Sequence, residues 1–338
     1  MTAASIDGVL VVDKPRGPTS HDVIARLRRA LRTRAVGHAG TLDPMGTGVL
    51  VVALGEATKL VPWLTAHDKA YEATIALGIE TDTLDAAGRE VRRVAPANAL
   101  VEALGALATM NASNALNASS VGRGAAASEG AAFAEAFERE RARTLQVPPV
   151  YSAIRTDGER SFARARRGET PELAARAVIV RRLELVAGRV DPPALDIAIE
   201  TGKGYYVRSL ARDLAEGLGT VGHLTALRRT RSGCFTLAEA VALDAQPEEL
   251  RARVEPLASA AARALPVARL SELGARDARH GRHVSAAEMD LADARAQVPH
   301  TPCAWVDPAG VLVAVGQLED DGRGRVLRGF DGESSLGG

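Results

Sequence analysis

The chain has 338 residues, of which 46% are hydrophobic and 25% charged, so it can bury a core and is long enough for about two domains. No apolar run approaches the roughly 18 residues of a membrane span, and the first residues lack a basic start followed by an apolar block. Two cysteines, Cys234 and Cys303, are too few for a disulfide framework. We therefore expect a soluble, cytoplasmic, globular protein and exclude membrane-spanning and disulfide-stapled classes.

The net charge of zero conceals an asymmetry along the chain. From Thr236 to the end there are 16 acidic and 11 basic residues, so residues 1–235 carry a net charge of +5. Only four cations are lysines, and the arginines cluster in RLRRALRTR (26–34), RSFARARRGE (160–169) and LRRTR (227–231). Forked guanidinium groups suit phosphate oxygens, which indicates a nucleic-acid partner. A solvated arginine-rich surface is the alternative.

The first part of the chain predicts short strands and helices in mixed order. Strands are expected in GVLVVDKP (8–15), GVLVVALG (48–55) and YEATIALG (71–78), and the polar TDTLDAAG follows the third. A helix is expected to begin at Thr19 or Ser20 and to bury Val23, Ile24, Leu27 and Leu31. EATKLVPWL (56–64) predicts another amphipathic turn or helix. This order favours an α+β fold with a mixed, mostly antiparallel central sheet.

The remainder of the chain predicts an interruption and then a second domain. Residues 109–130 are poor in large apolar side chains and rich in Ala, Ser, Asn and Gly, so we expect a disordered insertion there. A strand is expected at 195–200, a helix at 205–219, and a strand–turn–strand unit at 303–316. The resulting division is a large α+β domain at 1–250, a linker at 251–265 and a small β-rich domain at 266–332.

One acidic side chain, Asp43, stands in the tightly turned loop GHAGTLDPMGTGVL (37–50). A loop before a buried strand can hold a side chain rigidly, and neighbouring glycines allow a ligand to approach closely. A carboxylate that bonds its own turn is the ordinary alternative for an Asp beside Pro and Gly.

Three further polar side chains stand among apolar runs. Tyr71 opens a strand, Tyr151 follows a Pro–Pro pair, and Arg208 begins a helix after TGKGYY. Taken singly, each has a structural explanation in packing or solvation. GKG lacks the spacing and the Ser or Thr of a phosphate-binding loop.

Five ordered motifs, spread over residues 8–235, together resemble one known family. The chain is similar to the bacterial tRNA pseudouridine-55 synthases, the TruB family, in GVLVVDKPRGPTSHDV, GHAGTLDPMGTGVLVVALGEATKL, KAYEATIALGIETDTLDAAG, VPPVYSAIRTDG and GYYVRSLARDLAEGLGTVGHLTALRRTRSGCF. The resemblance implies a pseudouridine synthase fold followed by a PUA-like RNA-binding domain. It also implies isomerisation of one T-loop uridine of tRNA by a monomer that needs no cofactor or metal and no protein partner.

The resemblance carries roles onto positions of this chain. Asp43 would be the catalytic aspartate, Tyr71 would stack on the target base and assist proton removal at C5, and Arg208 would pair with Asp43. Leu227 would wall the pocket, and His38 would fill the space left by the extruded nucleotide. Positions with less certain duties near the RNA or the site are Lys14, Lys59, Asp85 and Tyr206.

The chemistry agrees with these roles. Isomerisation exchanges a bond to nitrogen for one to carbon, and an adjacent guanidinium favours the ionised form of the carboxylate it requires. Extruding the nucleotide costs a few kcal/mol, and stacking on an aromatic ring recovers about 1–3 kcal/mol. Attack at C1′, addition at C6 and removal of a sugar proton all stay open for Asp43. A tRNA-binding and folding protein without essential catalysis is the second functional hypothesis.

Some features depart from the family pattern or suggest other chemistry. Arg155 and Phe162 replace the usual Lys and Tyr but keep charge or bulk. Asp82 and Asp85 could suggest a two-carboxylate hydrolase, although turn-forming carboxylates are expected in TDTLDAAG. A zinc site is a further alternative, and its ligands would be His280, His283, His300 and Cys303.

Overall fold

The computed structural model describes residues 6–111, 127–152, 154–156, 159–169 and 171–331. Most of the predicted insertion lies outside these residues, between the end of helix α3 (Asn98–Asn111) and the start of helix α4 (Ala127–Arg141). Among the described residues, no helix is both long and apolar enough to cross a membrane.

The chain forms two compact units, each built from separate stretches of sequence. We name them the terminal unit (Met1–Pro44, Gly48–His67 and Arg231–Gly338) and the central unit (Met45–Thr47 and Asp68–Thr230). The terminal unit therefore contains Asp43, whereas the central unit contains Tyr71 and Arg208. The predicted domains, in contrast, are continuous stretches of sequence, and their boundaries stay a prediction.

Strand β1 is the middle of the sheet in the terminal unit. It pairs antiparallel with β3 from Gly8↔Leu54 to Lys14↔Gly48, and parallel with β15 at Val12↔Val241. The expected mixed, mostly antiparallel sheet is thus confirmed. The strands are β1 (Gly8–Lys14), β2 (Val36–His38), β3 (Thr47–Leu54), β14 (Phe235–Thr236), β15 (Val241–Ala242) and β16 (Glu255–Pro256).

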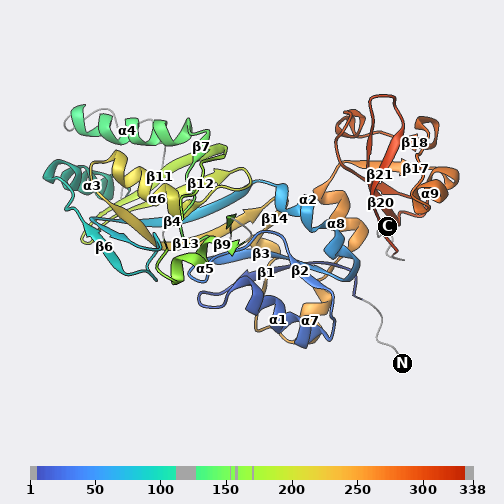
Figure 1. Cartoon of the computed structure of the whole chain (residues 1–338), viewed down its shortest axis with the longest axis horizontal. Helices are drawn as coiled ribbons and strands as arrows, with labels where there is room; N and C mark the ends of the chain where they lie inside the picture. Colours follow the sequence, from blue (N-terminus) through green and yellow to red (C-terminus); the bar gives the residue numbers. More distant parts are fainter. Residues whose placement is uncertain (1–5, 112–126, 153, 157–158, 170, 332–338) are drawn as a thin grey trace. The chain divides into compact units, whose positions relative to one another are not determined.

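Both faces of β1 and β3 are buried, because successive side chains of a strand point in opposite directions. One face carries Leu10 and Leu50 and packs against helix α1 (Ser20–Leu31). The other carries Val9 and Val51 and packs in a different cluster. The predicted helix is confirmed with Thr19 as its N-cap, and Figure 1 shows it beside helix α7 (Pro247–Ala252).

Residues 251–265 are more structured than the predicted linker. They contain helix α8 (Leu257–Ala264), whose Leu257 and Ala261 are buried in the cluster that holds Val9. The same cluster includes Val315 and Phe330 from the end of the chain. Alanines at helical spacing let α8 approach the sheet closely, a tertiary contact that composition alone did not reveal.

The C-terminal region is rich in β structure, as predicted. Its five-stranded sheet has the order β18-β17-β19-β20-β21, and its core includes Trp305, which is 1% exposed. The side elements of the terminal unit include η1 (Gly55–Leu60), α2 (Val61–Ala66) and α9 (Glu272–Arg279). The strands are β17 (Val267–Leu270), β18 (Met289–Asp290), β19 (Cys303–Val306), β20 (Leu312–Leu318) and β21 (Gly324–Gly329).

The central unit places strands in the order β11-β12-β4-β13, with α3, α4 and α6 packed around them (Figure 1). Antiparallel register aligns Tyr71 of β4 with Ile199 of β12. The main elements are β4 (Lys69–Leu77), β11 (Val180–Val190), β12 (Pro193–Thr201), α6 (Val207–Gly217) and β13 (Gly222–Ser232). Short additions are β5 (Ile79–Thr81), β6 (Glu90–Arg93), β7 (Leu145–Gln146), β8 (Arg155–Thr156), β9 (Glu159–Arg160), α5 (Ser161–Arg166) and β10 (Arg176–Ala177).

Candidate active site

The loop that carries Asp43 is tied down at the residues on both sides of it. The Ser20 hydroxyl, buried at the start of α1, donates to the Leu42 carbonyl (3.0 Å) and accepts from the Leu42 amide (2.9 Å). The Gly17 amide donates to the Pro44 carbonyl (2.8 Å). Asp43 itself is half-buried. The main chain is therefore held by its neighbours, and the carboxylate is set on a rigid support.

A buried cation supports the same loop. Lys14, at the end of β1, is fully buried, and its Nζ donates to the carbonyls of Pro15 (3.0 Å) and Pro44 (3.3 Å). A buried ammonium needs such acceptors, because desolvation of an uncompensated charge is costly. The structure thus brings Lys14 to the Asp43 loop, and its role at the site stays a prediction.

His38 lies at the end of β2, opposite Val52 of β3. Its ring meets that of His21 edge to face, with centroids 5.6 Å apart and planes at 85°. His21 is exposed at the start of α1, so the two imidazoles connect the entrance of the Asp43 loop with that helix.

Arg208 lies at the second residue of α6 and is 6% exposed. Its Nη1 donates to the Thr83 carbonyl (3.0 Å) and its Nη2 to the Tyr151 carbonyl (2.9 Å). Its Nε lies 3.9 Å from a carboxylate oxygen of Asp85. One guanidinium therefore joins α6 to two loops of the central unit.

The TDTLDAAG carboxylates serve their own turn, as predicted. Oδ1 of Asp85 accepts from the Thr83 hydroxyl (2.8 Å) and the Ala87 amide (2.9 Å). Oδ1 of Asp82 accepts from the Arg89 amide (2.9 Å). These bonds favour structural duties for both residues over a hydrolytic pair. Asp85 has the additional task of placing its second oxygen toward the Arg208 guanidinium.

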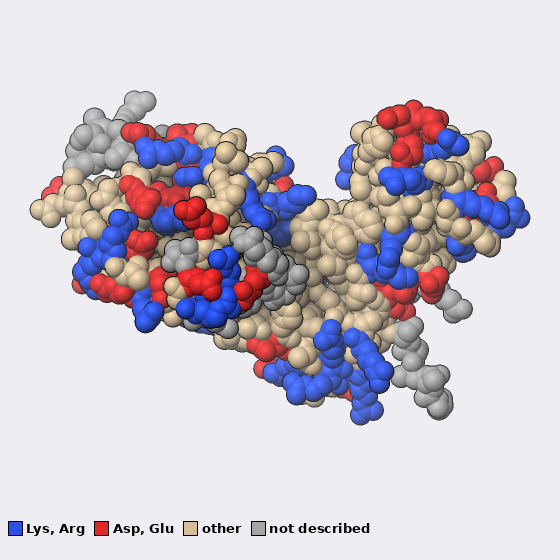
Figure 2. Space-filling model, in the orientation of Figure 1, with Lys and Arg blue, Asp and Glu red and all other residues tan. Residues whose placement is uncertain are grey.

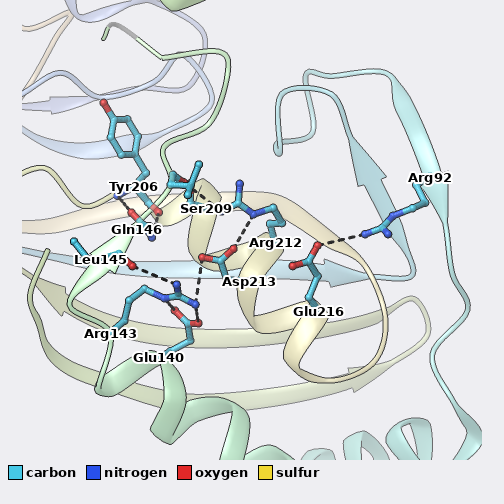
Figure 3. Close-up of polar contacts among 11 residues, drawn as sticks. Arg92, Glu140, Arg143, Leu145, Gln146, Tyr206, Ser209, Arg212, Asp213 and Glu216 are labelled. Carbon is cyan, nitrogen blue, oxygen red and sulfur yellow. Dashed lines mark hydrogen bonds and ion pairs between the residues drawn. The ribbon is translucent and has the colours of Figure 1, made fainter. Parts of the chain in front are cut away.

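Gln146 holds the N-terminus of α6 (Figure 3). Its side-chain oxygen accepts from the Tyr206 amide (2.9 Å), and its side-chain nitrogen donates to the Tyr206 carbonyl (3.2 Å). The Ser209 hydroxyl donates to the Val147 carbonyl (2.8 Å). Tyr206 is the N-cap of α6 but offers no capping bond from its side chain, so the buried Gln146 amide fixes this end of the helix instead.

A buried ionic network ties the middle of α6 to α4 (Figure 3). Glu140 of α4 is 1% exposed and accepts from Nε of Arg143 at 2.8 Å. The Arg143 guanidinium also lies 3.4 Å from the Asp213 carboxylate, which accepts from Arg212 at 2.7 Å. Burial raises the pKa of Glu140, and the Arg143 guanidinium acts in the opposite direction.

Of the remaining predicted residues, Tyr71 and Leu227 lie on strands of the central unit, and Lys59 lies in the terminal unit. Tyr71 is half-buried on β4, and the buried Leu227 of β13 accepts at its carbonyl from the Thr47 hydroxyl (3.4 Å). Lys59 contacts Glu56 (2.5 Å) and the Gly329 carbonyl (3.3 Å). Its observed contacts thus involve the C-terminal segment, and its role at the site stays a prediction.

Lys69 and Gln146 are side chains that motif reasoning missed. Lys69 precedes Tyr71 by two residues and so shares its face of β4, a spacing visible in KAY. Burial, with a smaller effect of the buried Arg229, lowers the pKa of Lys69 to about 8. Gln146 had no comparable signal, because its partner is a main-chain group 60 residues away.

The described residues offer no group of three or more His, Cys, Asp or Glu side chains suited to a metal ion. Nδ1 of His280 lies 2.7 Å from the Arg276 carbonyl, and Nε2 of His300 lies 3.2 Å from the Asp320 carboxylate. Burial raises the pKa of Cys303 to about 11, which disfavours the thiolate that a metal would need.

Comparison with known proteins confirms the resemblance. Residues 28–113 and 120–207 match the N-terminal domain model of the TruB family pseudouridylate synthases, and residues 208–261 match the tRNA pseudouridylate synthase B C-terminal domain. A tRNA pseudouridine synthase B of Thermobifida fusca is 46% identical over 285 residues, covering 82% of this chain and 87% of that protein. One of Arthrobacter sp. is 40% identical over 314 residues, covering 92% of each.

Solved structures with low sequence identity to this chain confirm its fold. A Cbf5–Nop10–Gar1 complex contains a chain with a TM-score of 0.65 and 22% identity, covering 96% of this chain and 84% of that one. An H/ACA RNP bound to a substrate RNA containing 2′-deoxyuridine contains a chain with a TM-score of 0.63 and 20% identity, covering 96% and 85%.

Proposed function

The chain belongs to the TruB family of pseudouridylate synthases, and from this membership we propose that it isomerises the uridine at position 55, in the T-loop of tRNA. At the level of the family it is a pseudouridine synthase that acts on tRNA. The finer proposal names Asp43 as the essential carboxylate. The observation that carries it is the anchoring of both sequence neighbours of Asp43, which leaves a half-buried acid on a rigid loop.

The reaction requires such an acid. The bond from C1′ to N1 of the uracil breaks, a bond from C1′ to C5 forms, C5 loses a proton and N1 gains one. Atoms and electrons balance within the nucleotide, so the protein must supply charge stabilisation, orientation and proton transfer. A carboxylate whose main chain is already ordered supplies the first two without reorganisation at the moment of reaction.

Arg208 completes the proposal as the cation that keeps Asp43 ionised, because a neighbouring guanidinium favours the charged form of a carboxylate. Its own position supports this role. Bonds to the Thr83 and Tyr151 carbonyls fix the orientation of the guanidinium, and a carboxylate oxygen of Asp85, also in the central unit, lies 3.9 Å from its Nε.

The other residues are proposed to receive the extruded nucleotide. Tyr71 would stack on the base, Leu227 would wall the pocket, and His38 would occupy the place the base has left. Flipping costs a few kcal/mol, and one aromatic stack recovers about 1–3 kcal/mol. Residues proposed to support RNA binding or the shape of the site are Lys14, Lys59, Asp85 and Tyr206.

The test compares the parent protein with Asp43→Asn on unmodified tRNA, mapping pseudouridine by position and measuring tRNA affinity in parallel. We expect product at position 55 from the parent and none from Asp43→Asn, with binding retained. Asp321→Asn is the control, because it makes the same chemical change in an exposed ion pair with Arg323. Product from Asp43→Asn at the parental rate would contradict the assignment. Binding by the parent without any product would favour a tRNA-binding and folding protein.

A further inference from the structure

Seven exposed arginines gather on α1, on α7 and on the residues that follow each helix. Figure 2 shows a dense group of basic side chains at this part of the terminal unit, where Figure 1 draws α1 and α7. We name it the α1–α7 arginine surface. Its members are Arg26, Arg28, Arg29, Arg32, Arg34, Arg251 and Arg253.

Several arginines elsewhere on the described surface are paired with carboxylates, while others, such as Arg176 and Arg269, are exposed without one, so the seven differ in being gathered together. Arg93, Arg182 and Arg189 are exposed and each forms an ion pair, with Glu90, Glu184 and Asp196. Throughout the part of the chain that the structure describes, no member of the α1–α7 arginine surface lies within 4 Å of a carboxylate. Favourable placement in the last turn of a helix explains three members at most, Arg28 and Arg29 of α1 and Arg251 of α7. The surface therefore holds an excess of uncompensated positive charge.

Part of this charge is concentrated in a hollow of about 390 Å³. Three arginines line it, Arg29, Arg32 and Arg251, together with one acidic residue, Glu248; its other lining residues are Ala30 and Pro247. Arg251 is also bonded to the Leu31 carbonyl at 3.4 Å. Three arginines and one acidic residue leave the lining with a net positive charge, which suits phosphate oxygens because they accept paired hydrogen bonds from guanidinium groups.

The surface and the Asp43 loop are joined by one rigid element. Ser20, which holds the Asp43 loop, is the first residue of α1, and Leu31 is the last. At a rise of about 1.5 Å per residue these ends lie about 16 Å apart. A phosphate in the hollow and a nucleoside beside Asp43 would therefore belong to different nucleotides.

We propose that the α1–α7 arginine surface binds the sugar–phosphate backbone of tRNA at nucleotides other than the one that is modified. This inference rests on the proposed function, since it takes tRNA as the occupant. Such contacts release counterions and supply affinity that is independent of sequence and sensitive to salt. The surface thus helps to bind and orient the RNA, and removal of its arginines raises both Kd and KM.

The experiment measures the Kd of unmodified tRNA between about 50 and 200 mM salt for a triple variant, Arg29→Ala with Arg32→Ala and Arg251→Ala. We expect weaker binding and a slope of log K against log salt that is smaller by about 2, because each phosphate contact contributes about 0.7–0.9. The matched control removes three ion-paired arginines, Arg93→Ala with Arg182→Ala and Arg189→Ala, and we expect it to keep the parental slope. Thermal unfolding verifies that both variants fold.

Lysine at the three surface positions preserves the charge, so this second variant should recover most of the slope. An unchanged slope in the alanine variant, or equal losses in the surface and control variants, would overturn the proposal. Failure of the proposed function is recognised separately, because the parent would then bind tRNA with the same salt slope but form no pseudouridine.

Discussion

The Asp43 loop and the Arg208 end of α6 are fixed in opposite ways. At the loop, neighbours do the holding: Ser20 and Gly17 bond the main chain on either side of Asp43. At α6, the functional side chain itself does the holding, since the Arg208 guanidinium bonds the carbonyls of Thr83 and Tyr151. The bonds from Ser20 and Gly17 hold the loop through the main chain of Leu42 and Pro44 and not through the Asp43 carboxylate, whereas the Arg208 guanidinium is itself part of the support.

This difference separates chemistry from stability. A change in the Asp43 side chain should remove activity and leave the fold intact, and a change in the residues behind the loop should lower stability and reduce activity only in part. At α6 the two effects should appear together. The following substitutions test this distinction.

Arg208→Ala should have the largest effect on stability. It leaves two part-buried carbonyls without these donors, at a cost of about 1–2 kcal/mol each, so we expect the free energy of unfolding to fall by about 2–4 kcal/mol and pseudouridine formation to cease. Urea unfolding of the parent, Arg208→Ala and Asp43→Asn checks the comparison. Equal stability of the two variants would show that the Arg208 bonds contribute little.

Gln146→Leu should weaken the same end of α6 while it retains every residue proposed to be catalytic. The Tyr206 amide and carbonyl lose their buried partners, and we expect about 1–3 kcal/mol less stability together with a lower kcat, because Arg208 follows Tyr206 by two residues. The control is Gln297→Leu, which removes an exposed amide bonded to the Leu291 carbonyl. A fall in stability without any change in kcat would limit Gln146 to a structural duty.

Ser20→Ala should loosen the Asp43 loop from behind. Both bonds to Leu42 are lost, so we expect about 1–2 kcal/mol less stability and a lower kcat with little change in KM. Ser259→Ala serves as control, since its hydroxyl bonds Glu255 at 2.7 Å away from the loop. If both variants lowered kcat equally, the anchoring of Asp43 by Ser20 would lose its support.

Lys69 gives the smallest effect and the clearest dependence on pH. At pH 7 it is protonated in both states, so the folded protein bears the cost of a buried ammonium. Above the folded pKa of about 8 the folded state releases this proton while the unfolded state keeps it, and stability therefore rises with pH. Between pH 8 and 9 we expect the parent to gain up to about 1 kcal/mol relative to Lys69→Met. Parallel unfolding curves across this window would refute the lowered pKa of Lys69.

Local patterns were sufficient for most elements of the fold. The alternation and apolar runs of β1, β3 and β12 predicted strands, and Thr19 predicted the start of α1. The predicted linker shows what composition cannot decide. An alanine-rich segment is typical of a linker, but in α8 the small side chains are buried because other elements pack closely against them.

The candidate residues could be named from the sequence, because a motif specifies which side chain stands at each of its positions. Their supports were not, since Gln146 with Tyr206 and Arg208 with Thr83 are joined through main-chain groups that every residue possesses. Likewise, the arginines of α1 were visible as a cluster, but the addition of Arg251 across the hollow required α7 to fold beside them. The sequence by itself determines the chemical type of each side chain. The hydrogen-bond partners of backbone carbonyls and amides are decided only by the tertiary structure, because they come from distant segments that must first pack together.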